Sequence, residues 1–166
     1  MAPLTFIISN ATQRDALELA HLATALSCDQ HAFKPPAFAR KFPLARNLRA
    51  VHEREMRALL RSRKAIVLKA VECASGKIVG FLAGEERMHR PRFARRRYAY
   101  LYALFVLPRW RRKGIARALF REFERWAEKR GLHEVSLKVC ARNAAGRAFY
   151  ERVGTKLVWL ELKKFV

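Results

Sequence analysis

Residues 106 to 116, VLPRWRRKGIA, combine the residue types of an anion-binding turn: an apolar run and a proline precede four cationic side chains and a glycine. From Ile115 the apolar residues recur with helical spacing, so the turn places backbone N–H groups at a helix N-terminus, where they bind anions. Gly114 and Ala116 allow the backbone to approach a ligand closely. The pattern indicates a phosphate site, although a solvated strand-to-helix connection is the alternative for the turn taken alone. It has one glycine, unlike the dinucleotide fingerprint, and lacks the Gly-Lys-Ser/Thr of a P-loop.

A second motif, NAAGRAFYERVG, occupies residues 143 to 154. Its tyrosine, Tyr150, carries a phenol whose ordinary pKa near 10 keeps it protonated at neutral pH, so it can donate a proton to a departing group. Core packing beside Phe149 is the alternative role for this side chain. The motif therefore adds a candidate proton donor to the candidate phosphate site.

Together the two motifs resemble the coenzyme A site of the GCN5-related N-acetyltransferase (GNAT) superfamily. The resemblance implies an α/β fold with a mixed, mostly antiparallel central sheet flanked by helices, formed by residues 1–166 as a single domain. It also implies direct transfer of an acetyl group from acetyl-CoA, used as co-substrate without a metal, to a primary amine. The chain departs from the family pattern at Gly146, where alanine is usual, and at Thr155, where phenylalanine is usual.

The same resemblance implies roles for individual residues. Backbone amides of the turn would contact the coenzyme pyrophosphate; they belong to Arg111, Arg112, Lys113, Gly114, Ile115 and Ala116. The strand edge at Leu104, Phe105 and Val106 would pair with pantetheine, where a bulged strand typically splays open. Asn143 would hydrogen-bond the pantetheine arm, Arg147 would reach the phosphates, and Tyr150 would donate to the thiolate.

The general base has several candidates. Some N-terminal acetyltransferases of the superfamily carry Leu-Glu-Val before the asparagine helix, whereas this chain has Leu137-Lys138-Val139, and a lysine serves as a base only if its pKa is depressed. Glu85 and Tyr100 are the candidates we select. Glu85 and Glu86 can equally be surface partners of Arg87, and Tyr98, Tyr100 and Tyr102 share one face of a strand as core or cleft lining. No base is needed if the amine arrives neutral.

The charge is strongly positive: 35 Lys and Arg against 14 Asp and Glu give a formal net charge of +21. Such a charge attracts polyanions. Residues 87 to 97 interleave arginines with His89 and Phe93 and contain no acidic residue, which suits phosphate contacts and base stacking, although solvated surface charge is the alternative. The acceptor is therefore a small amine, a protein or a tRNA-linked amine, acidic or nucleic-acid-associated in the last cases. A basic nucleic-acid- or ribosome-binding module that keeps the coenzyme-binding fold without catalysis is the alternative function.

The elements that must position these residues follow from periodicity and from the breaks at proline and glycine. We expect helices at 12–27, 44–62, 114–130 and from 143, with a proline-interrupted loop at 28–43. Strands are expected at 4–9, 65–72, 77–86, 98–106, 134–139 and 156–163. Gly131 is expected to cap the third helix.

Composition predicts a cytosolic protein, since the sequence shows neither a membrane-spanning stretch nor a signal-peptide pattern. The three cysteines are expected to be free thiols, and packing is preferred over a nucleophilic role for Cys140. After residue 155 only one strand's length remains where many family members have two strands. The acceptor side is therefore expected to be open or completed by a second subunit, as in a homodimer.

Overall fold

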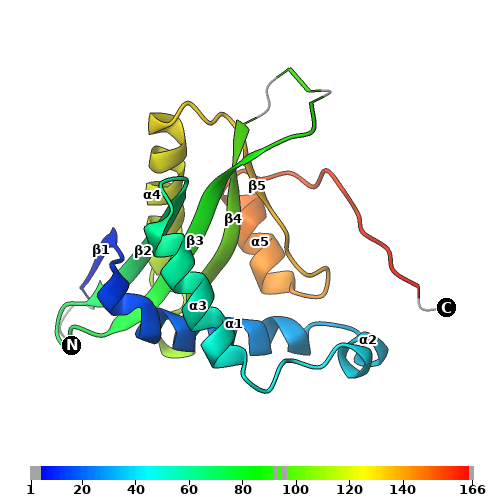
Figure 1. The fold of residues 1–166 in the computed structure, drawn as a ribbon, viewed down its shortest axis with the longest axis horizontal. Coiled ribbons are helices and arrows are strands. Elements are labelled where there is room, and N and C mark those ends of the chain that lie inside the picture. The colour runs from blue at the N-terminus through cyan, green and yellow to red at the C-terminus, as the bar shows by residue number, and fades with distance from the viewer. Residues whose placement is uncertain (1–4, 92, 95–96, 165–166) are drawn as a thin grey trace.

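The sheet that carries the fold has five strands in the order β1-β2-β3-β4-β5 (Figure 1). The computed structural model describes residues 5–91, 93–94 and 97–164. The strands are β1 (Phe6–Asn10), β2 (Ala65–Glu72), β3 (Ile78–Met88), β4 (Arg97–Val106) and β5 (Val135–Leu137). β1 to β4 are antiparallel neighbours, and β5 runs parallel to β4. The mixed, mostly antiparallel sheet expected from the sequence is confirmed.

Helices cover both faces of this sheet because alternate strand residues are apolar on both sides. Leu82 and Val106 pack against α4 (Ile115–Lys129), which contributes Phe120 and Phe123, and α5 (Ala144–Arg152) packs on the same cluster. Their chain neighbours Phe81 and Phe105 point to the opposite face, where they pack with residues of α1 (Ala16–Ala32) and α3 (Leu48–Arg61). The two clusters hold the sheet between two helical layers.

A β-bulge interrupts the pairing of β3 with β4 beside the candidate site. Ala83 pairs with Ala103 and Gly84 with Leu101, so Tyr102 has no partner residue on β3. A Cβ at position 84 would lie 2.5 Å from Cε2 of Phe123 and 2.8 Å from the carbonyl oxygen of Tyr100. Glycine is therefore required there because the bulge brings the strand against the ring of Phe123.

The first half of the chain is more helical than the sequence predicted. α1 extends through Ala32 after a short 3₁₀ turn (Gln13–Asp15), and α2 (Pro36–Lys41) lies within the range expected to be a loop. The helix ends before Pro35 because a proline disfavours helical geometry in the residue that precedes it. Pro36 then occupies the first turn of α2, a position that proline tolerates. The prediction of a loop from residue 28 was wrong, and α3 is shorter than predicted.

Residues 156–163 were expected to form a final strand, and that prediction was wrong. Thr155 to Lys164, which we call the extended segment, form no regular element and run away from the sheet (Figure 1). Strand propensity alone does not create a strand, since its backbone groups need a neighbouring edge. Of residues 134–139, only Val135–Leu137 pair with β4, and the two strands separate beyond Leu137.

Candidate active site

A cleft opens where β4 and β5 separate, on the side of the sheet where α5 packs. Its volume is about 190 Å³. The pairing of the two strands stops at Leu101 with Leu137, and the bulge turns Tyr102 toward the opening. Side chains from α1, β4, the start of α4, the segment after β5 and α5 line it; they are Leu26, Gln30, Leu101, Tyr102, Leu104, Val106, Arg111, Ala116, Lys138, Val139, Cys140, Asn143, Gly146, Phe149 and Tyr150.

The basic turn forms the start of α4, as the sequence predicted. Gly114 is the N-cap with φ +82°, and Arg112 has φ +64°, which is rare for a residue with a side chain. Among the described residues, no acceptor receives the backbone N–H groups of residues 112 to 117. Successive free N–H groups at a helix N-terminus form a site for an anion such as a phosphate.

The side chain of Arg111 is engaged with the protein itself. Its Nε donates to the carbonyl oxygen of Val106 at 3.0 Å, and Nη2 donates to Oδ2 of Asp29 at 2.9 Å. The guanidinium also lies 5.6 Å from the ring centroid of Phe105. Arg111 therefore connects the end of β4 to the last part of α1.

Asn143 caps α5 with its side chain. Oδ1 accepts a hydrogen bond from the backbone N–H of Gly146 at 2.9 Å. A Cβ at position 146 would lie 2.6 Å from Nδ2 of Asn143, so the amide in this position needs a glycine below it. Because the oxygen is used for capping, the Nδ2 group is the part of the amide that can donate to a ligand in the cleft.

Tyr150 reaches the cleft from α5. Its ring packs against Phe120 and Phe149, with centroids 6.3 and 5.2 Å away. Burial raises the pKa of the Tyr150 phenol to about 12, because the charged phenolate loses its solvation. The hydroxyl is therefore protonated over the whole physiological range and can act as a donor.

Glu85 belongs to a polar cluster above the cleft. Tyr102 donates its hydroxyl proton to Oε1 of Glu85, and Nε of Arg87 donates to the same oxygen at 2.9 Å. The Arg87 guanidinium lies 3.9 Å from the ring centroid of Tyr100 and 4.7 Å from that of Tyr102. Burial and the bond to Glu85 raise the pKa of Tyr102. Tyr102, rather than Tyr100 or Glu85, reaches the cleft.

The structure thus brings together only some of the residues selected from the sequence. Leu104, Val106, Arg111, Ala116, Asn143 and Tyr150 line the cleft. Phe105 and Ile115 are buried in the core, 5% and 1% exposed, so only their backbone groups can serve a ligand. The remaining selected residues lie outside the lining; they are Glu85, Tyr100, Arg112, Lys113, Gly114 and Arg147.

Several lining residues were not selected from the sequence. Leu26 and Gln30 come from the part of α1 that was expected to be a loop or its border, and Phe149 was treated as core. Tyr102 was weighed as cleft lining by strand alternation but not selected. Cys140 lines the cleft and donates its thiol to the carbonyl oxygen of Phe33 at 3.5 Å. Sequence periodicity could identify Tyr102, whereas the α1 residues required the fold.

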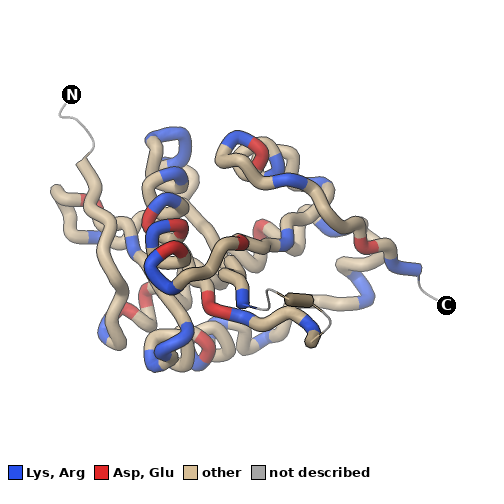
Figure 2. The backbone as a smooth tube through the Cα atoms, turned by 90° about the horizontal axis from the view of Figure 1, so that it is seen from above, with Lys and Arg blue, Asp and Glu red and all other residues tan. Residues whose placement is uncertain are grey.

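The arginine-rich run is partly neutralised. Arg87 is bound to Glu85, and Arg97 donates to Glu86 at 2.6 and 3.0 Å. Arg92, Arg95 and Arg96 lie outside the described residues. Figure 2 shows Lys and Arg at many points along the backbone, far more often than Asp and Glu. The positive charge is therefore a property of the whole chain, and two of the arginines expected to be available for phosphate are held by glutamates.

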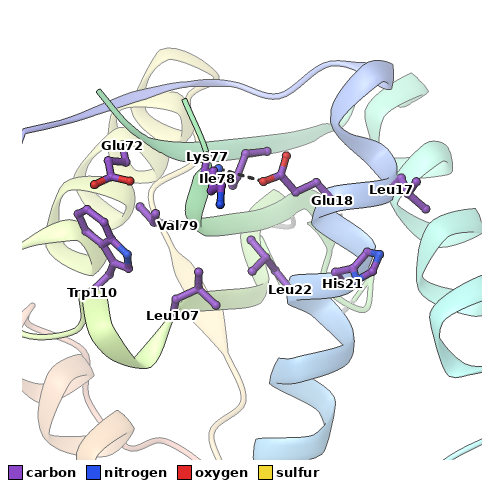
Figure 3. A pocket seen from close by; sticks show the side chains of 10 residues that line it. All are labelled: Leu17, Glu18, His21, Leu22, Glu72, Lys77, Ile78, Val79, Leu107 and Trp110. Carbon is purple, nitrogen blue, oxygen red and sulfur yellow. Dashed lines mark hydrogen bonds between the residues drawn. The ribbon is translucent and has the colours of Figure 1, made fainter. Parts of the chain in front are cut away.

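A second hollow of about 480 Å³ lies between α1, the β2–β3 hairpin and η2 (Pro108–Trp110) (Figure 3). Leu22, Leu107 and Trp110 provide apolar walls, and Glu18 is fixed there by accepting the backbone N–H of Ile78 at 3.0 Å. Tyr150, Asn143 and the free N–H groups of the turn are absent from its lining. The chemistry expected from the sequence is gathered in the smaller cleft.

Within the described ranges, no three His, Cys, Asp or Glu side chains are grouped so as to hold a metal ion. No helix in the same part of the chain is both long and apolar enough to cross a membrane.

Comparison with known proteins adds a family match and a set of similar folds. The model of the acetyltransferase (GNAT) family matches residues 31–155. No curated protein matches the chain significantly.

Solved structures with this fold cover nearly the whole chain. A tetramutant of a Bacillus halodurans protein is 22% identical with a TM-score of 0.81, over 96% of this chain and 99% of that one. A predicted acetyltransferase of Clostridium acetobutylicum, solved with acetyl-CoA, is 19% identical with a TM-score of 0.76, over 96% of both chains. An aminoglycoside 6′-N-acetyltransferase of Acinetobacter baumannii is 22% identical with a TM-score of 0.70, over 98% of this chain and 99% of that one.

Proposed function

This chain belongs to the acetyltransferase (GNAT) family and is an acyltransferase, and we propose that it transfers the acetyl group of acetyl-CoA directly to a primary amine. The observation that carries the proposal is the cleft between β4 and β5. One cavity is lined both by the start of the helix that follows the anion-binding turn and by a buried, protonated tyrosine. These are the two parts that a phosphate-bearing thioester substrate requires.

Acetyl-CoA is the proposed co-substrate. The free N–H groups of residues 112 to 117 suit its pyrophosphate, and Arg112 and Lys113 add positive charge nearby. The edge of β4 at Leu104 to Val106, which β5 leaves unpaired, suits the amides of the pantetheine arm. Nδ2 of Asn143 suits one of the carbonyl oxygens of that arm, because Oδ1 is committed to the helix cap.

In the proposed reaction the amine nitrogen attacks the thioester carbonyl carbon and forms the new C–N bond. Backbone N–H groups on the unpaired edge of β4 stabilise the developing oxyanion. The C–S bond then breaks, and Tyr150 donates its proton to the departing thiolate. Burial fits Tyr150 for this step because its raised pKa keeps the proton in place until the sulfur becomes basic.

The amine must also lose a proton. We propose that Tyr102 and Glu85 receive it as a unit, because the Tyr102 hydroxyl reaches the cleft and is already bonded to Glu85. Arg87 favours the charged form of Glu85 through its hydrogen bond. Tyr100 contributes by packing against Tyr102, with ring centroids 5.2 Å apart, and by stacking on the Arg87 guanidinium.

The acceptor class is a primary amine, and the charge of the chain favours amines carried by an acidic protein or by RNA over free small amines. A formal net charge of +21 exceeds what one coenzyme needs. A second copy of the chain is a further proposed partner, because the sheet ends on β5 with no described strand beyond it.

Release of free thiol from acetyl-CoA, measured with a panel of amines, tests the proposal. Tyr150→Phe should lower kcat by about 10²-fold while the KM for acetyl-CoA changes less than about threefold, because only the donor is removed. Tyr98→Phe, on the same sheet outside the cleft lining, is the matched control and should keep full activity.

Two outcomes would contradict this function. If acetyl-CoA neither binds nor raises the melting temperature, the coenzyme site is wrong. If Tyr150→Phe raises KM as much as it lowers kcat, the side chain serves packing rather than proton donation. Labelled acetyl-CoA incubated with cell extract, followed by mass spectrometry, identifies the acceptor when transfer occurs.

A further inference from the structure

The extended segment leaves its apolar side chains in solvent. The exposed fractions are 75% for Leu157, 73% for Val158, 86% for Trp159, 75% for Leu160 and 93% for Leu162. β-Branched, aromatic and leucine side chains in a run of this length are typical of a buried strand. A contiguous exposed apolar surface of this kind marks a site of association.

The outer edge of β5 is the natural place for such a strand. β5 is the last strand of the sheet and pairs only with β4, through Ala99 to Leu101. Among the described residues, no backbone hydrogen bond from another segment reaches the outer side of Val135–Leu137. An uncovered strand edge is a template for a further strand. The extended segment begins near β5 but runs away from it (Figure 1).

A strand added to β5 within one copy would bury only one of its two apolar faces. In a strand, Leu157 and Trp159 point to one side, while Val158, Leu160 and Leu162 point to the other. One side would meet α5, which packs against the sheet next to β5. On the other side of the sheet the neighbouring strand exposes Tyr102 to 40%, so this part of the sheet lies open. The two-sided apolar pattern requires a second body to cover the remaining face.

We propose that the extended segments of two copies are exchanged, each adding as a strand to the outer edge of β5 in the other copy. The exchange gives a closed two-fold dimer in which both segments are paired and both of their faces are covered. Each cleft then gains a wall from the partner beside β5, because the cleft begins where β5 separates from β4. The partner copy thus completes the side of the site that is open in one chain.

Charge makes this association distinctive. Each copy carries a formal net charge of +21, so two copies repel one another, and added salt screens this repulsion. Dimerisation should therefore strengthen as salt rises. Binding of a polyanion has the opposite salt dependence.

Sedimentation equilibrium of the full chain, without acetyl-CoA, tests the exchange. We expect a mass of twice 19.3 kDa and a dimer dissociation constant that falls several-fold between low and moderate salt. Leu160→Asp should raise this constant at least about tenfold, because it places a charge on a buried strand face. Met88→Asp is the matched control: Met88 is 57% exposed at the end of β3 and should leave the constant unchanged.

Hydrogen exchange of the amides of residues 157 to 162 shows where the segment pairs. Protection that grows with protein concentration is expected for the exchanged dimer. A monomer at all concentrations overturns the proposal, whether the segment is protected on its own β5 or not protected at all. A dimer that Leu160→Asp leaves intact overturns it as well. Since no coenzyme or activity enters these measurements, their outcome is independent of the acetyl transfer proposed above.

Discussion

Asn143 and Gly146 form one unit at the start of α5: Oδ1 of Asn143 accepts the Gly146 N–H, and Nδ2 lies 2.6 Å from where a Cβ at position 146 would stand. The glycine that departs from the family pattern is thus explained by the position of the asparagine amide above it. Its helix-propensity cost of roughly 1 kcal/mol is comparable to the contribution of a helix cap.

Substitutions of Asn143 should separate capping from coenzyme binding. Asn143→Ser keeps an oxygen for the Gly146 N–H but removes the amide donor, so stability should change little while the KM for acetyl-CoA rises. Asn143→Ala removes both, and should also lower stability by about 1 kcal/mol, or the melting temperature by roughly 2–4 °C. Calorimetry and steady-state kinetics measure the two effects. Equal KM values for Asn143→Ser and the unchanged protein would remove Asn143 from the coenzyme site.

Tyr150 should make the fold sensitive to alkali. Its pKa is about 12 in the folded chain against 10 in the unfolded chain, so between these values the folded state binds the proton more tightly. Stability is fully present below pH 10 and falls as pH rises toward 12, by at most about 3 kcal/mol. Urea unfolding across this pH range measures the decline. Tyr150→Phe should decline less steeply by that amount, and parallel curves for the two proteins would contradict the burial of the phenol.

Glu86 should contribute stability that acid removes. Its carboxylate accepts hydrogen bonds from Arg97 on β4 and from Arg130 after α4, and these, the Arg97 bond first, lower its pKa. Because the folded pKa lies below the unfolded value, the contribution is present above pH 4.5 and is lost as pH falls through the lowered pKa. Glu86→Gln should therefore lower the melting temperature at pH 7 and reduce its dependence on acid. The exposed Glu122, whose replacement should have little effect, is a suitable control.

Tyr102 and Tyr100 should differ in their kinetic effects. Tyr102→Phe removes the hydroxyl that links the cleft to Glu85, so kcat should fall about tenfold or more when the amine is mostly protonated. The loss should shrink at high pH, where the amine arrives neutral. Tyr100→Phe keeps the ring that packs on Arg87 and should have a much smaller effect. A pH–rate profile for each variant decides between a proton-transfer role and a packing role.

Arg95→Glu with Arg96→Glu tests the polyanionic acceptor without breaking the bond between Arg97 and Glu86. If RNA or an acidic protein carries the amine, its KM should rise and the salt dependence of binding should flatten by roughly one unit of slope for each phosphate that the variant no longer neutralises. The KM for acetyl-CoA should not change. An unaltered acceptor KM would assign these arginines to solvated surface.

The sequence predicted those parts of the fold whose pattern is local. The hairpin of β2 and β3, the long β4, and α4 with its glycines at both ends follow from alternation, helical spacing and turn residues. Gly131 caps α4, since its N–H and that of Leu132 bond the last carbonyl groups of the helix. The candidate phosphate turn was likewise predictable, because one continuous stretch of chain forms it.

Features that depend on distant segments were not predictable. Leu26 and Gln30 reach the cleft because α1 continues beyond Cys28, and its length is decided by Pro35 rather than by apolar periodicity. The strand expected at 156–163 failed for the same reason, since its propensity finds no edge within the described chain. Glu85 was selected by its place at the end of a strand, and only the bulge at Gly84 brings Tyr102 between Glu85 and the cleft.

Arg111 also connects two binding events. Its guanidinium bonds Asp29 of α1 and the end of β4, close to the turn whose N–H groups await an anion. A phosphate at the turn competes with Asp29 for this cation, and release of Asp29 frees the part of α1 that lines the cleft through Gln30. We therefore expect an obligatory order, with the coenzyme binding before the acceptor. Asp29→Asn, which weakens the restraint at the surface, should make the order random in initial-rate kinetics.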